Sequence, residues 1–99
     1  MLLHGLIEKE DNLYSALCLE LDVASQGKSI QEAKRNLKEA VGLYLETVYE
    51  EGDEKEFIPR PAPVEEWLKF FEVQARALGR ESFKRKTPIS LELDSVVLT

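Results

Sequence analysis

The fold of this chain is decided by residues 29–52, which read SIQEAKRNLKEAVGLYLETVYEEG. Ser29 and Glu32 have the spacing of a helix-capping pair, in which the serine hydroxyl accepts a hydrogen bond from the amide three residues later. The apolar residues of this stretch recur at three- and four-residue spacing, which places them on one stripe of a helix. They are Ile30, Ala33, Leu37, Ala40, Val41, Tyr44, Leu45 and Val48. We expect a helix that covers a sheet with this stripe, packs closely at Gly42 and ends at Gly52.

The residues before this helix predict antiparallel strands. Residues 2–7 are mostly apolar, and a short polar segment with turn-forming residues follows them. Residues 13–23 alternate with period two, and because their odd positions are the more apolar, we expect the odd face to be buried. A bend at residues 20–22, a short third strand at residues 23–25 and a turn at Gly27 complete an expected strand-strand-strand-helix unit.

The second part of the chain begins with a stiff connector. Three prolines within residues 59–63 remove backbone donors and favour extended geometry. A second helix is expected between Pro63 and Gly79, and the alternation within residues 88–99 predicts a terminal strand. The expected stripe of that helix comprises Val64, Trp67, Leu68, Phe71, Ala75 and Leu78. The predicted fold class is therefore α+β, a small antiparallel sheet with one helix packed on it, followed by a second helix and a C-terminal strand.

Length and charge limit the class of protein. A chain of 99 residues usually builds one compact unit. We expect an α+β domain at residues 1–61, with a helix-strand extension at residues 62–99 that completes the same unit or forms an oligomer interface. The net charge of -6 argues against a surface devoted to nucleic acid. A single cysteine, short apolar runs and no secretory-type N-terminal pattern predict a cytoplasmic protein without a membrane span.

The sequence presents no convergent set of catalytic or metal-binding residues. His4 and Cys18 are the only histidine and cysteine, and although they could form a nucleophile-base pair across the hairpin, a surface histidine and a core cysteine are the commoner roles. One residue of each type is too few for a zinc site. Glu20 and Asp22 share a strand face, where solvated acids are common. We expect no enzymatic activity, no metal and no cofactor.

Five short motifs follow one another in the first part of the chain. They are YSALCLELDVASQG (residues 14–27), SIQEA (29–33), NLKEAV (36–41), LYLE (43–46) and IPRP (58–61). Their order resembles the HicB family of prokaryotic antitoxins over roughly residues 1–61, although Leu19 stands where members often carry proline. The resemblance implies a partial ribonuclease H-like fold and binding to a small RNA-cleaving toxin of the HicA type. Residues 62–99 show neither a ribbon-helix-helix nor a helix-turn-helix pattern, so DNA binding stays open.

Two functions remain open at this point. The first is a non-catalytic antitoxin-like module, in which the acidic residues of positions 1–57 imitate the polyanion that a HicA-type toxin grips. This segment holds thirteen acids and six bases, a net charge of -7. Its candidate toxin contacts, chosen by position and charge, are Glu8, Asp11, Glu20 and Asp22. The second is a stand-alone homo-oligomeric structural or regulatory protein, without a toxin or a DNA-binding role.

Surplus apolar residues in the second part of the chain predict a homodimer or a dimer of dimers. The candidate interface residues are Trp67, Phe71, Ile89, Leu91 and Leu93. A basic cluster lies between Arg76 and Lys86. Basic side chains at the end of a helix complement its dipole, but they could also contact an acidic partner.

Overall fold

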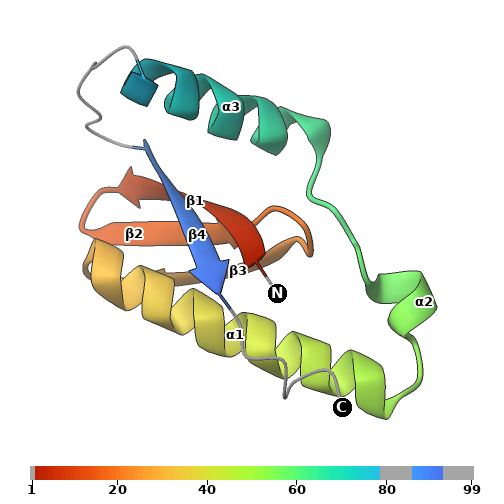
Figure 1. Cartoon of the computed structure of the whole chain (residues 1–99). Coiled ribbons are helices and arrows are strands. Elements are labelled where there is room, and N and C mark those ends of the chain that lie inside the picture. Colours follow the sequence, from red (N-terminus) through yellow and green to blue (C-terminus); the bar gives the residue numbers. More distant parts are fainter. Residues whose placement is uncertain (1, 79–85, 93–99) are drawn as a thin grey trace.

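The computed structural model describes residues 2–78 and 86–92 of the chain. An antiparallel sheet lies between two long helices, one on each face (Figure 1). The elements are, in chain order, β1 (Leu2–Glu10), β2 (Leu13–Cys18), β3 (Val23–Gly27), α1 (Ile30–Glu50), α2 (Glu54–Phe57), α3 (Val64–Leu78) and β4 (Lys86–Glu92). The predicted α+β class is confirmed, including the second long helix and the C-terminal strand. The short helix α2 was not predicted.

The strands of the sheet run in the order β3-β2-β1-β4. β1 and β2 form the expected hairpin, with Gly5 opposite Cys18, and β2 pairs with β3 across the predicted bend. β4 returns along the other edge of β1, which sets Leu91 opposite Leu3. The C-terminal strand is therefore part of the same sheet as the first three strands.

The main core fills the space between the sheet and α1. The predicted stripe of α1 faces it, with Leu37, Val41 and Leu45 fully buried. The prediction that the odd positions of residues 13–23 form the buried face is correct only for Leu19 and Leu21, since within β2 the even residues Ala16 and Cys18 are buried and face α1. Helices cover both faces of β2, so both faces are apolar, and the small side chains lie where α1 packs.

Ser29 and Gly27 each have a structural role at the start of α1. Ser29 caps the helix, and its hydroxyl accepts a hydrogen bond of 3.0 Å from the Glu32 amide. Gly27 does not form the predicted turn but lies within β3, where an added Cβ would stand 2.5 Å from the amide nitrogen of Ala33. A glycine at this position lets the first turn of α1 approach the strand. At Gly42, by contrast, an added Cβ would meet nothing within 4 Å, so the predicted close packing there is wrong.

A second, smaller core lies between the sheet and α3. Leu19, Ala62 and Phe70 are buried in it, with Leu17 and Trp67 packed against them. Within the predicted apolar stripe of α3, Val64, Leu68 and Phe71 are all exposed, while Trp67 is partly buried. α3 carries a second apolar side, which includes Phe70 and Val73, and the sheet covers that side. Helical spacing alone does not tell which of the two sides faces the sheet.

Candidate functional site

The carboxylate of Glu20 is held by His4. Glu20 lies two residues after the end of β2, and its two carboxylate oxygens lie 2.8 Å from the backbone nitrogen of His4 and 2.7 Å from its Nδ1. The edge of the His4 ring also meets Phe70 of α3, with the two ring centroids 5.8 Å apart. Glu20 therefore ties the end of β2 to β1 beneath α3, and it is only partly available to another molecule.

The proposed pairing of His4 with Cys18 does not occur. Gly5 lies opposite Cys18 in the sheet, and His4, the next residue, points to the other face, toward Phe70. Cys18 is fully buried in the core beneath α1, and this burial raises the pKa of its thiol to about 11. The two side chains are separated by the sheet, and Cys18 serves as core filling.

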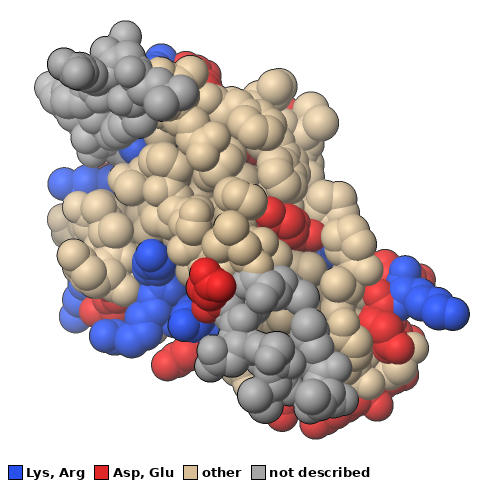
Figure 2. Space-filling model, viewed as in Figure 1, with Lys and Arg blue, Asp and Glu red and all other residues tan. Residues whose placement is uncertain are grey.

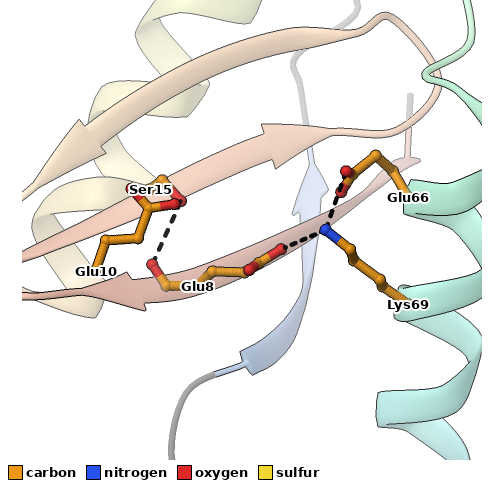
Figure 3. Close-up of polar contacts among 5 residues, drawn as sticks. All are labelled: Glu8, Glu10, Ser15, Glu66 and Lys69. Atoms are coloured by element: carbon orange, nitrogen blue, oxygen red, sulfur yellow. Dashed lines mark hydrogen bonds and ion pairs between the residues drawn. The ribbon is translucent and has the colours of Figure 1, made fainter.

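Glu8 contacts α3 through Lys69. The ammonium of Lys69 lies 3.4 Å from Glu8 and 3.1 Å from Glu66, so it bridges an acid of β1 and an acid of its own helix (Figure 3). The hydrogen bond to Glu66, together with the charge of Glu8, raises the pKa of Lys69. Such partly exposed pairs contribute about 0–1 kcal/mol each. Glu8 is thus engaged within the chain, like Glu20.

The two remaining candidate acids lie at opposite ends of β2. Asp11 occupies the β1-β2 turn and Asp22 precedes β3; both are exposed and have positive φ angles, of 51° and 54°. Aspartate tolerates this left-handed geometry better than most residues. The backbone oxygens of Leu21 and Asp22 accept hydrogen bonds from Arg60, at 3.1 and 3.2 Å, which fixes the second turn. The four predicted acids therefore do not form one surface.

The densest group of acids among the described residues is at the end of α1 and in α2. We call it the acidic corner: it comprises Glu46, Glu50, Glu51, Asp53, Glu54 and Glu56. Lys55 is the one base between positions 46 and 56, and red side chains gather over this end of the molecule in Figure 2. Four of the six acids are exposed. Our sequence analysis missed this group, although the run EGDEKE at residues 51–56 signals it.

The opposite end of α1 is basic. Lys34, Arg35 and Lys38 are exposed in the first half of the helix, and Lys28 is exposed just before it. Blue side chains accordingly gather over the start of α1 in Figure 2. This distribution opposes the helix dipole, which favours acids at the start and bases at the end. The charge of residues 1–57 is thus not spread evenly but separates along α1.

Within residues 2–78 and 86–92, no group of three or more histidine, cysteine, aspartate or glutamate side chains is arranged to hold a metal ion. No helix in these two segments has the length and apolar character needed to span a bilayer.

Comparison with known proteins identifies the family. No family model matches the chain. It is, however, 44% identical over 70 residues to a UPF0150 protein of Helicobacter pylori strain J99, an alignment that covers 66% of this chain and 94% of that protein. The chain belongs to the UPF0150 family. Nearly the whole length of this UPF0150 relative thus has a counterpart here, and about a third of the chain has none in that alignment.

The interface residues expected for this UPF0150 chain are not on one surface. Leu91 is buried in the main core, and Ile89 packs against that core, so neither is free to meet a partner. Trp67 is partly buried against the small core. Phe71 is exposed on α3, whereas Leu93 lies outside the described residues.

The predicted basic cluster is described only at its two ends. Arg76 donates a hydrogen bond of 2.7 Å to Glu72, one turn earlier on α3. Lys86 begins β4, opposite Glu8 of β1. Arg80, Lys84 and Arg85 lie outside the described residues.

Proposed function

We propose that this UPF0150 chain is a non-catalytic, antitoxin-like module that binds and neutralises a small RNA-cleaving toxin of the HicA type. UPF0150 is the HicB-like family, and this membership is the observation that carries the proposal. The HicB-type motifs lie on or beside the elements that build the main core. YSALC comprises all of β2 after its first residue, Leu13. SIQEA begins at the N-cap of α1, and IPRP is the connector that follows α2.

The connector motif has a structural role in this unit. Arg60 donates to the backbone oxygens of Leu21 and Asp22, and its guanidinium stacks 4.7 Å from the ring centroid of Tyr44 on α1. The Tyr44 hydroxyl in turn donates to the backbone oxygen of Phe57, at 2.7 Å. Arg60 and Tyr44 thereby join the β2-β3 turn, α1 and α2, which supports a rigid binding surface at this end of the domain.

The acidic corner is the surface that we assign to the toxin. Its exposed acids are not in ion pairs within the described residues, whereas Glu8 and Glu20 are bonded inside the chain. A dense acidic surface attracts a basic protein over a distance and accelerates its association, while apolar contacts lengthen the life of the complex. A toxin that binds RNA needs a basic surface, and the acidic corner would compete for it.

A binding experiment with matched variants tests this function. The probe is a purified HicA-type toxin encoded beside the gene for this chain, and its association with the full chain is measured by stopped-flow at several salt concentrations. We expect binding, rescue of cells that express the toxin, and association that slows as salt rises. In the variant Glu50→Gln/Glu51→Gln/Glu56→Gln, the association rate at low salt should fall about tenfold.

The control is the variant Asp11→Asn/Asp22→Asn, because asparagine keeps the positive φ angles of both turns while it removes their charges. Its association rate should stay within about twofold of wild type, since an isolated exposed charge has little effect. Equal losses in both variants would remove the acidic corner from the proposal. Absence of both binding and rescue would refute the antitoxin function and favour the stand-alone alternative.

A further inference from the structure

One apolar side of α3 is left open to solvent. We call it the outer stripe: it comprises Val64, Leu68, Phe71 and Ala75. The first three are 68%, 62% and 54% exposed, and Ala75 is exposed as well. The spacing of four, three and four residues keeps all four side chains on one line of the helix. α3 is therefore apolar on two sides, of which the sheet covers one.

A row of this kind differs from the single exposed apolar residues that are common on protein surfaces. Leu43 of α1, which is 65% exposed, is such a single residue. Gly42 precedes it and the charged residue Glu46 lies about one turn later, so no apolar row continues from it. The outer stripe instead continues for eleven positions from Val64 to Ala75, about 16 Å of helix at 1.5 Å per residue. A continuous apolar row on a helix is typical of a helix-helix interface.

We propose that the outer stripe packs against the outer stripe of a second copy of this chain, with the two α3 helices antiparallel. Charge on the helix favours this partner and this direction. The first turn of α3 carries Glu65 and Glu66, and its last turn carries Arg76. An antiparallel pair sets each acidic first turn beside the basic last turn of the other subunit and opposes the two helix dipoles. A parallel pair would place like charges together.

The order of residues along the outer stripe fits the same twofold symmetry. Leu68 and Phe71, the two largest, are in the middle, with Val64 and Ala75 at the ends. A twofold axis between positions 68 and 71 therefore brings Leu68 of one subunit against Phe71 of the partner subunit, and Val64 against Ala75 of the partner subunit. The stripe is thus complementary to itself in size as well as in charge.

This dimer goes beyond the proposed antitoxin function and leaves its surface open. α1 covers the sheet on the face opposite to α3, and α2 follows the far end of α1 (Figure 1). Two chains joined through α3 would each keep the acidic corner free. Because a 15-residue helix offers less than the roughly 800 Å² per partner of a standard interface, we expect a Kd on the order of micromolar.

Sedimentation velocity on the full chain, from about 1 to about 100 µM, tests the dimer across the expected Kd. Wild type should shift from monomer to dimer over this range, and Leu68→Glu should stay monomeric throughout. The matched control is Leu43→Glu, since Leu43 is a leucine of nearly equal exposure on the other long helix; it should dimerise like wild type, and circular dichroism should show that both variants are folded. A wild type that remains monomeric, or equal dissociation of the two variants, would overturn the proposal.

Disulfide cross-linking tests the direction of the helices. Cys18 is buried, with a pKa raised to about 11, so it gives little background at pH 8. The double variant Val64→Cys/Ala75→Cys should form cross-linked dimers, whereas Val64→Cys alone should not, because a disulfide needs Cα atoms within about 7 Å. The two new cysteines are too far apart on one helix to pair within a chain. Cross-linking of Val64→Cys alone would indicate parallel helices and refute the proposed arrangement.

Discussion

The two faces of the sheet are covered in different ways. Beneath α1, ten buried residues form one cluster, and it includes Ala33, Leu37, Val41 and Leu45 of the apolar stripe of the helix. Beneath α3, the cluster has only three buried residues, and Val64, Leu68 and Phe71 of the helix are exposed. Apolar burial therefore fixes the position of α1, whereas α3 needs additional contacts to hold its place.

Those additional contacts are polar and lie at the edge of the small core. The connector before α3 is pinned to the sheet, since the amides of Arg60 and Ala62 donate to the backbone oxygens of Glu20 and Leu19 at 3.0 and 2.8 Å. Lys69 adds its bridge to Glu8. Each contact contributes on the order of 1 kcal/mol or less. α3 is thus held by fewer apolar contacts than α1, and the α1 side should dominate the stability of the domain.

The largest effect is expected from the α1 face. Leu37→Ala removes a fully buried side chain from the cluster beneath α1 and should lower the free energy of unfolding by ~2–5 kcal/mol through the cavity that it leaves. Leu43→Ala on the same helix removes an exposed leucine and should change it by less than ~0.5 kcal/mol. Denaturant titration of both variants provides the measurement. Similar values would contradict the assignment of the buried face of α1.

Native-state hydrogen exchange compares the two faces directly. Amides in the middle of α1 should exchange only through global unfolding, whereas those of α3 should exchange through a local opening that is roughly 2 kcal/mol less costly. The measurement is made below the concentration at which the chain self-associates, because a dimer through α3 would protect that helix. Equal protection of the two helices in the monomer would show that α3 is held as firmly as α1.

The same difference explains what could be predicted from the sequence. For α1, three local signals predict the same helix: the cap at Ser29, the apolar stripe, and Gly52 after its end, whose φ is 73°. The helix was therefore predicted with its correct buried face. For α3, two apolar sides compete, and the choice depends on how the connector meets Leu19 and Glu20, which is a long-range contact. The buried face of residues 13–23 was only partly predicted for a related reason, because both odd and even positions are buried there and period two does not tell which face α1 covers.

The candidate acids illustrate a second limit. The prediction of Glu8, Asp11, Glu20 and Asp22 rests on their expected position in the sheet and on their charge, but their side chains lie in different places once the sheet forms. Hydrogen bonds to His4 and contacts with Lys69 depend on register and on packing of α3, which local patterns do not contain. The acidic corner, in contrast, is a local feature of residues 46–56 and could have been found by charge density alone.

The buried thiol on the α1 face predicts a pH dependence of stability. The pKa of Cys18 is about 11 in the folded chain, because burial disfavours the thiolate, against 9.0 for an ordinary thiol. Well below pH 9 the thiol is neutral in both states. As pH rises through 9 toward 11, the thiol of the unfolded chain loses its proton while that of the folded chain mostly keeps it, so stability falls as pH rises. The loss by pH 11 is on the order of 2 kcal/mol.

Comparison with Cys18→Ala isolates this contribution, because lysines and tyrosines titrate in the same range in both proteins. The free energy of unfolding is measured by denaturant titration from pH 8 to 11, and wild type should lose stability more steeply than the variant. If the free energies of unfolding of the two proteins fell in parallel with pH, the thiol would ionise as readily in the folded chain as in the unfolded one. Water would then reach Cys18 between β2 and α1.

Two glycines both border α1, but replacing them with alanine should change the stability with opposite signs. At Gly42 an added Cβ meets nothing within 4 Å, so Gly42→Ala should stabilise the chain by ~0.5–1 kcal/mol, since alanine loses less backbone freedom in a helix. At Gly27 the added Cβ would lie 2.5 Å from the backbone of Ala33, which cannot move without shifting the first turn of α1, so Gly27→Ala should destabilise the chain by about 1–3 kcal/mol. Thermal and denaturant unfolding of the two single variants measures the pair. A stabilising Gly27→Ala would show that α1 does not pack closely on β3 at its start, and a destabilising Gly42→Ala would show that the middle of α1 has a neighbour, as an interface with another chain on that side would provide.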